Sequence, residues 1–163
     1  MNVTPLISKA LGIILAALIL PILSACIHEK EEPAWSLSAG DRLPSFTVET
    51  LDGEIVTSAD SYVSSLVIIF FNTSCRDCRE ELPRLQKEYE ANLMLPEPQQ
   101  SRYICISREE GAADVAAYWT EEGLTMPVAP ETDRKVYSLF ASSGIPRVFT
   151  ARDGVLTSAR EGR

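Results

Sequence analysis

The sequence has one histidine, His28, and only four cysteines among its 163 residues. A structural zinc site takes four Cys or His ligands, so this small and scattered set makes a metal centre a weak hypothesis, and we expect none. Lysine and arginine form no cluster, and acidic residues outnumber basic ones by 23 to 15. This charge pattern argues against nucleic-acid binding. The length suits one domain, and we find no internal repeat.

The sequence also lacks an apolar run long enough to cross a bilayer. The run "ALGIILAALILPIL" at 10–23 falls short of the roughly 20 residues that a spanning helix needs. It follows Lys9 and ends in "LSAC" at 23–26, which fits a secretory signal and resembles a bacterial lipobox. We therefore expect a signal peptide over 1–25 and lipid attachment at Cys26. The alternative is a retained N-terminal anchor with a buried Cys26, and both hypotheses place the remaining chain outside the cytoplasm, on the periplasmic side of a bacterial membrane.

Residues 26–38 are mostly polar and charged, and we interpret them as a tether between the lipid anchor and a domain at 39–163. His28 lies in this tether with no second histidine nearby, so we expect a solvated side chain. Within the domain, the patterns predict a hairpin at Asp52-Gly53, strands at 65–71 and 102–107 with a helix after each, a third helix from Thr132 to Gly144, and a hairpin at Asp153-Gly154. The residues 107–110 match a capping box that would begin the second helix. This order predicts an α/β fold with a central mixed sheet and helices on both faces.

Two of the cysteines, Cys75 and Cys78, are spaced C-x-x-C between the first predicted strand and its helix. Cys75 would lie at the helix N-terminus, where free N–H groups and the helix dipole favour a thiolate. Cys78 would lie one turn further, close enough to attack a mixed disulfide on Cys75. A permanent disulfide across two residues would stabilise the fold little, because stabilisation grows with the length of the closed loop. Redox exchange is therefore favoured over a structural disulfide or half of a metal site. Cys105 lies in the strand at 102–107 and is expected to be a core thiol.

Four stretches, taken in order, resemble the extracytoplasmic thioredoxin-like proteins of the TlpA/ResA type. These are "AGDRLPSFTVETLDGEIV" at 39–56, "FFNTSCRDCREELP" at 70–83, "SGIPRVF" at 143–149 and "ARDGVL" at 151–156. The resemblance implies a thioredoxin-like fold in which Cys75 is the nucleophile and Cys78 the resolving thiol. It also implies a cis-proline at Pro146, which with Ile145 would shape the substrate groove.

The same resemblance assigns Glu81 an acidic role beside the disulfide, where it would exchange protons with the thiols; the alternative is a solvated helix charge. It implies no cofactor beyond the redox-active disulfide Cys75–Cys78. The implied activity is that of a thiol–disulfide oxidoreductase that reduces protein disulfides, with a role in cytochrome c maturation and a membrane protein as electron donor. Protein thiols and disulfides would be its substrates, and the lipid bilayer would hold it through Cys26.

Two departures from the family pattern stand out. Ser74 occupies a position where the family often has tryptophan, and the C-terminal helix that usually follows the last hairpin is lacking. That lack implies an exposed apolar patch, a partner or a shortened protein. Two other functions stay open. One is a peroxiredoxin-like thiol peroxidase, although Ile68 and Asn72 stand where that pattern has proline and threonine. The other is a non-enzymatic lipoprotein module for binding or for carrying metal on a thioredoxin scaffold.

Overall fold

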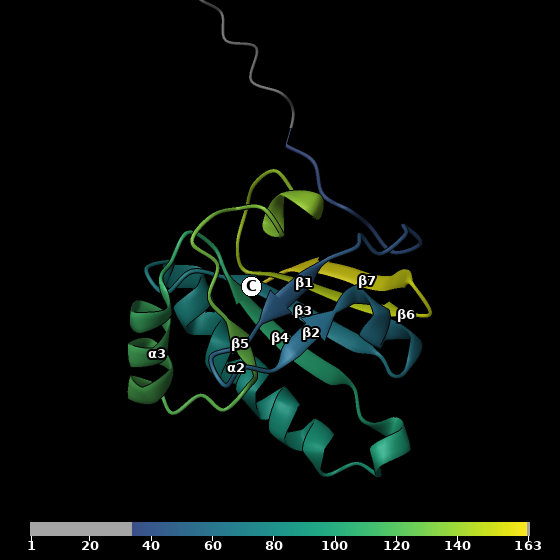
Figure 1. The fold of residues 1–163 in the computed structure, drawn as a ribbon, viewed down its shortest axis with the longest axis horizontal. Helices are drawn as coiled ribbons and strands as arrows, with labels where there is room; N and C mark the ends of the chain where they lie inside the picture. The colour runs from purple at the N-terminus through teal and green to yellow at the C-terminus, as the bar shows by residue number, and fades with distance from the viewer. Residues whose placement is uncertain (1–33, 163) are drawn as a thin grey trace, which may run out of the picture. The chain divides into compact units, whose positions relative to one another are not determined.

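The computed structural model describes residues 34–162, which form a central five-stranded mixed sheet, a separate hairpin and two α-helices (Figure 1). The strands are β1 (Thr47–Glu49), β2 (Ile55–Thr57), β3 (Leu66–Phe71), β4 (Arg102–Ser107), β5 (Val128–Ala129), β6 (Arg147–Arg152) and β7 (Val155–Glu161). The helices are α2 (Arg76–Leu93) and α3 (Ala112–Glu121), with short 3-10 turns η2 (Ser58–Tyr62), η3 (Glu97–Gln99) and η4 (Tyr137–Leu139). The sheet order is β5-β4-β3-β6-β7. Both predicted hairpins and the mixed sheet are confirmed.

Strand β3 lies at the centre of the sheet, and all six of its side chains are buried. It pairs in parallel with β4 and antiparallel with β6. A run of β-branched and aromatic residues suits such a position, because both faces of the strand are covered. Strand β3 ends at Phe71, and the short loop 72–74 leads from it to Cys75.

The two α-helices pack on the same face of the sheet. Side chains from α2 and α3 share one core cluster with Val67, Ile69 and Phe71 of β3. The opposite face carries Leu66, Ile68 and Phe70, and it is covered by the β1–β2 hairpin and the segment around η4. The expectation of α-helices on both faces is therefore corrected: within 34–162 the second face is covered by a hairpin and a 3-10 turn.

The third predicted helix, from Thr132 to Gly144, is wrong, since this stretch contains only the short turn η4. Its side chains explain the difference. Asp133 Oδ1 accepts the N–H of Lys135, which offers the backbone an alternative to helical pairing. Leu139 is exposed, whereas Tyr137 is buried.

The capping box at 107–110 is also wrong. Ser107 ends β4 instead, and the N-cap of α3 is Gly111. Ser107 Oγ accepts the N–H of Glu131, and the Glu110 carboxylate points to another loop. Both side chains make long-range contacts, which a local pattern does not contain.

Among the described residues, no helix follows β7. On the sheet face beside α2, Val148 and Thr150 of β6 pair with Arg160 and Ser158 of β7, respectively. Only Val148 of these four is apolar, and it is buried in the α2 cluster. On these two strands the one large apolar side chain that is exposed is Val155, beside the turn. Of the three alternatives named for the lack of a C-terminal helix, an exposed apolar patch is therefore not found on β6 and β7.

The first described residues are part of the domain. Trp35 exchanges hydrogen bonds with Ser142, and Leu37 N donates to Phe140 O over 2.8 Å. The compact unit begins at Ala34, earlier than the expected start at Ala39. The segment 1–25, expected to be a signal peptide, and Cys26, the expected site of lipid attachment, lie outside the described residues. No helix within 34–162 combines the length and apolar character needed to cross a membrane.

Candidate active site

Cys75 is the N-cap of α2, as the sequence predicts. Its backbone is extended, and its Sγ accepts the N–H of Cys78 over 3.3 Å. A hydrogen bond of this kind, at the positive end of the helix dipole, stabilises a thiolate. The side chain is half-buried, so it can reach a reaction partner in solvent. The position combines access to solvent with a backbone N–H donor directed at the sulfur.

Cys78 lies inside the first turn of α2 and is fully buried. Burial raises the pKa of the Cys78 thiol, and its hydrogen bond with Cys75 adds to this effect. The positive charge of Arg108 acts in the opposite sense. Both cysteines are free thiols in the structure. The pair therefore consists of an accessible sulfur and a shielded one, as attack followed by resolution requires.

The loop before β6 lies against this cysteine pair. The peptide bond between Ile145 and Pro146 is cis, which confirms the conformation implied by the resemblance. The Cys75 thiol donates to the carbonyl oxygen of Ile145 over 3.6 Å. Residues far apart in the sequence are thus brought together at the thiol, and any molecule bound to Cys75 would lie beside this loop.

Three side chains donate hydrogen bonds to backbone carbonyl oxygens of the loop before β6. Arg134 Nη2 donates to the carbonyl of residue 142 and Arg147 Nε to that of residue 143, over 2.9 Å each. The Tyr137 hydroxyl donates to Gly144 O over 2.7 Å. Gly144 itself has φ +83, a conformation that favours glycine. These donors were not predicted, because nothing in the local sequence pattern relates them to the loop.

The hydrogen bonds from Arg134, Tyr137 and Arg147 to the loop, which we call the clamp, lead to a stability prediction. Tyr137→Phe should lower the free energy of unfolding by about 0.5–1.5 kcal/mol, because the hydrogen bond to the carbonyl of Gly144 is lost. Tyr118→Phe is the matched control, since within 34–162 the buried Tyr118 hydroxyl has no hydrogen-bond partner. That change should be neutral or stabilising. Urea denaturation of both variants measures the difference, and equal stabilities would refute the clamp.

A second loop, 72–74, leads from β3 to Cys75 and is anchored by side chains. The Asn72 amide donates to Arg108 O over 2.9 Å, and its Oδ1 accepts both the N–H and the hydroxyl of Ser74. The Glu110 carboxylate accepts the N–H of Thr73 over 2.9 Å. Asparagine at the start of a turn is a recognised signal for such bonds. Ser74, at the family's frequent tryptophan position, therefore completes a polar turn.

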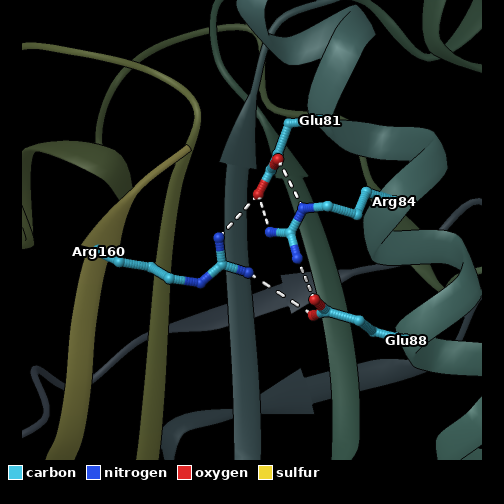
Figure 2. A pocket seen from close by; sticks show the side chains of 4 residues that line it. All are labelled: Glu81, Arg84, Glu88 and Arg160. Atoms are coloured by element: carbon cyan, nitrogen blue, oxygen red, sulfur yellow. Dashed lines mark hydrogen bonds and ion pairs between the residues drawn. The ribbon is translucent and has the colours of Figure 1, made fainter. Parts of the chain in front are cut away.

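Glu81 is not a solvated helix charge, since its side chain is only 3% exposed. Figure 2 shows its carboxylate between the guanidinium groups of Arg84 and Arg160. Arg84 is the main cause that lowers the pKa of the Glu81 carboxyl; burial opposes it, and Arg160 adds to the lowering. The carboxyl is thus ionised at neutral pH. The proton exchange with the thiols that the resemblance implies stays a prediction.

Cys105 is fully buried, as expected of a core thiol, and its Sγ lies 3.9 Å from Met126 Sδ. Burial raises the pKa of this thiol. Across residues 34–162, no three His, Cys, Asp or Glu side chains gather as metal ligands would. Cys75 and Cys78 are therefore the cysteines that combine position and partners for chemistry in the described domain.

A mixed sheet, a C-x-x-C pair at the N-terminus of the helix after its central strand, and an adjacent cis-proline loop together define a thioredoxin-like protein. Comparison with protein families agrees with this class. The chain belongs to the AhpC/TSA family, whose model matches residues 39–158. Within it, the similarity to ResA confirms the predicted TlpA/ResA type.

Two curated relatives come from Bacillus subtilis. Thiol-disulfide oxidoreductase ResA is 25% identical over 84% of this chain and 72% of its own length. The thioredoxin-like protein YneN is 30% identical over 56% of this chain and 53% of its own length. Among solved structures, a putative protein disulfide isomerase from Bacteroides thetaiotaomicron has a TM-score of 0.68 at 24% identity, covering 78% of this chain and 83% of that one. This likeness confirms the thioredoxin-like fold.

Proposed function

We propose that this chain is an extracytoplasmic thiol–disulfide oxidoreductase that reduces protein disulfides through Cys75 and Cys78. One observation carries the proposal: Cys75 Sγ accepts the N–H of Cys78 at the start of α2, while its thiol faces Ile145 O. This geometry supports a nucleophilic sulfur, a resolving sulfur one turn away and a backbone surface beside them. The relative named thiol-disulfide oxidoreductase ResA supports the same activity.

In the proposed reaction, the Cys75 thiolate attacks one sulfur of a substrate disulfide. A mixed disulfide forms, and the other substrate sulfur leaves as a thiolate that takes up a proton. Cys78, once it has lost its own proton, attacks Cys75 Sγ and releases the second substrate thiol. Two electrons have then passed to the substrate, and Cys75–Cys78 is a disulfide. A dithiol donor, which we place in the membrane, would return two electrons to restore the pair.

The finer parts of the proposal rest on the sequence. The signal-like run before Cys26 supports a lipid-anchored protein on the periplasmic side of a bacterial membrane. The reductant direction and a place in cytochrome c maturation come from the TlpA/ResA resemblance. Membrane fractionation after [³H]palmitate labelling, with Cys26→Ala as the control, tests the anchor independently of the redox chemistry.

The exchange step is tested by trapping. In the full chain carrying Cys78→Ala, a mixed disulfide on Cys75 cannot be resolved from within, so covalent adducts with a disulfide-containing protein such as insulin should accumulate. The adducts should release on reduction and should be absent when Cys75 is also replaced by alanine. Cys105→Ala combined with Cys78→Ala should trap as efficiently as Cys78→Ala. Absence of adducts under all conditions would refute the proposal.

A thiol peroxidase is a competing function, and a peroxide-consumption assay on the same protein distinguishes it from disulfide exchange. Ile68, where the peroxiredoxin pattern has proline, is fully buried in β3. The side chain of Asn72, where that pattern has threonine, is hydrogen-bonded to Ser74 and to the backbone of Arg108. These contacts favour disulfide exchange. We expect the reduced chain to consume hydrogen peroxide slowly, and rapid turnover with peroxide would favour the competing function.

A further inference from the structure

Glu81 is held by arginines from two different elements. It lies three residues after Cys78 in α2, and residues at this spacing lie on the same side of a helix. Arg84, from the next turn of α2, forms a paired contact with both carboxylate oxygens. Arg160, from β7, donates Nη1 to Glu81 Oε1 over 2.7 Å. Figure 2 shows Arg160 reaching this carboxylate from across the hollow, opposite α2.

The position of Arg160 follows from the register of the sheet. Arg160 pairs with Val148 of β6, whose side chain packs into the α2 cluster, so this side of β7 faces the helix. Its Nη2 also lies 3.6 Å from Glu88 Oε2. Arg160 thereby connects two acidic residues of α2 to the strand, and together with Arg84 they line a hollow of about 410 Å³.

The surroundings of Glu81 place it next to the cis-proline loop. A side chain at Gly162 would meet the ring of Pro146 at 2.2 Å and Glu81 Cγ at 3.2 Å, so these three residues are in close contact. Gly162 N also donates to Pro146 O over 2.9 Å. The end of β7 thus runs between the buried acid and the loop that faces Cys75.

The charges around Glu81 can be counted from every element packed against it. Helix α2 contributes the thiols at its first turn, Arg84 and Glu88; β7 contributes Arg160; β4 contributes Tyr103 at its margin. Pro146 and Gly162 contribute no ionisable group. Two guanidinium groups therefore balance two carboxylates. Without Arg160, one negative charge would remain unbalanced in a buried place beside the thiols, where it would oppose a thiolate.

We propose that Arg160 is a positioning residue that holds the Glu81 carboxylate toward β7 and balances its negative charge on the helix that carries Cys75 and Cys78. The proposal rests on the proposed exchange chemistry of those thiols. Its consequence is that Arg160, in a strand remote from the C-x-x-C motif in sequence, sets the reactivity of the pair. Loss of Arg160 leaves the negative charge of Glu81 without its partner from β7, on the helix that carries both thiols, where it disfavours a second negative charge.

The test compares Arg160→Met with Arg160→Lys in the reduced full chain. Iodoacetamide labelling of the peptide that carries Cys75 is followed between pH 5 and pH 9. Arg160→Met should react about threefold to tenfold more slowly at pH 7 than wild type, with an altered pH profile. Arg160→Lys keeps the charge but cannot contact Glu81 and Glu88 with two separate nitrogens, so its rate should lie between those of Arg160→Met and wild type. Arg152→Met, which removes an exposed arginine from the neighbouring strand, is the matched control and should leave the profile unchanged.

Glu81→Gln distinguishes action through Glu81 from a direct effect of the arginine charge. In that background Arg160→Met should change the labelling rate by less than about twofold, because residue 81 then carries no negative charge to be balanced. An unchanged profile for Arg160→Met, with a native circular dichroism spectrum, would overturn the proposal, and so would equal slowing in the Glu81→Gln background. Failure of the proposed function would look different: wild type itself would form no Cys75–Cys78 disulfide in oxidising buffers.

Discussion

Replacing Cys75 with serine should lower the rate of disulfide reduction by at least about a thousandfold, because the hydroxyl is a far weaker nucleophile at neutral pH. The serine side chain fits the N-cap position, where serine is favoured, so the fold should be retained. The half-buried thiol that faces Ile145 would be lost, and Cys78 is too deeply buried to replace it. Reduction of insulin disulfides by the full chain, with dithiothreitol as donor, measures the effect.

Cys105→Ala is the matched control for this experiment. Its thiol is fully buried and touches Met126, so its removal should affect stability more than rate. We expect activity within about twofold of wild type, since the thiol lies in the core and away from solvent. Activity retained by Cys75→Ser would show that Cys75 is not the nucleophile. Activity lost in a folded Cys105→Ala would show that Cys105 takes part in the reaction. Either result would contradict the site described above.

The second large effect is on stability. Phe70→Ala should lower the free energy of unfolding by about 3–5 kcal/mol, because it removes a fully buried ring from the centre of β3. That ring packs against Tyr137, Phe140 and Phe149 at centroid distances of 5.4, 5.0 and 6.1 Å. The loss is a large fraction of the about 5–15 kcal/mol that holds a typical domain together. Urea denaturation followed by tryptophan fluorescence provides the measurement.

Phe70→Leu keeps much of the buried volume and should unfold between wild type and Phe70→Ala. Val63→Ala removes an exposed apolar side chain and should change stability by less than about 0.5 kcal/mol. Since Tyr137 also holds Gly144 O, the Phe70→Ala cavity should loosen the loop before Pro146 as well. Equal stabilities for Phe70→Ala and Val63→Ala would contradict the assignment of Phe70 to the core.

Local patterns predicted the features that depend on neighbouring residues. The apolar run of β3, the Asp-Gly turns and the position of Cys75 at a helix start all follow from short stretches of sequence. The cis peptide before Pro146 was predicted by resemblance to a family and is found in the structure. The third helix failed because Asp133 binds the backbone of Lys135 and tertiary contacts hold the segment as an irregular loop.

The features that the sequence did not predict are long-range. Glu110, interpreted as part of a capping box, binds Thr73 across a separation of 37 residues. Arg160 reaches Glu81 over a separation of 79 residues. Each of these polar side chains is unremarkable in its own segment. Their partners are determined by the order and register of the strands, which a single sequence does not specify.

The central claim is that Cys75 and Cys78 form one redox couple. The most direct measurement is to equilibrate the full chain in a series of reduced and oxidised glutathione buffers, quench with acid, alkylate the free thiols and identify the modified cysteines by mass spectrometry. We predict a two-electron transition in which Cys75 and Cys78 lose alkylation together while Cys105 remains a thiol. A chain in which these two cysteines stay reduced in fully oxidising buffer, or in which Cys105 is the partner, would contradict the claim.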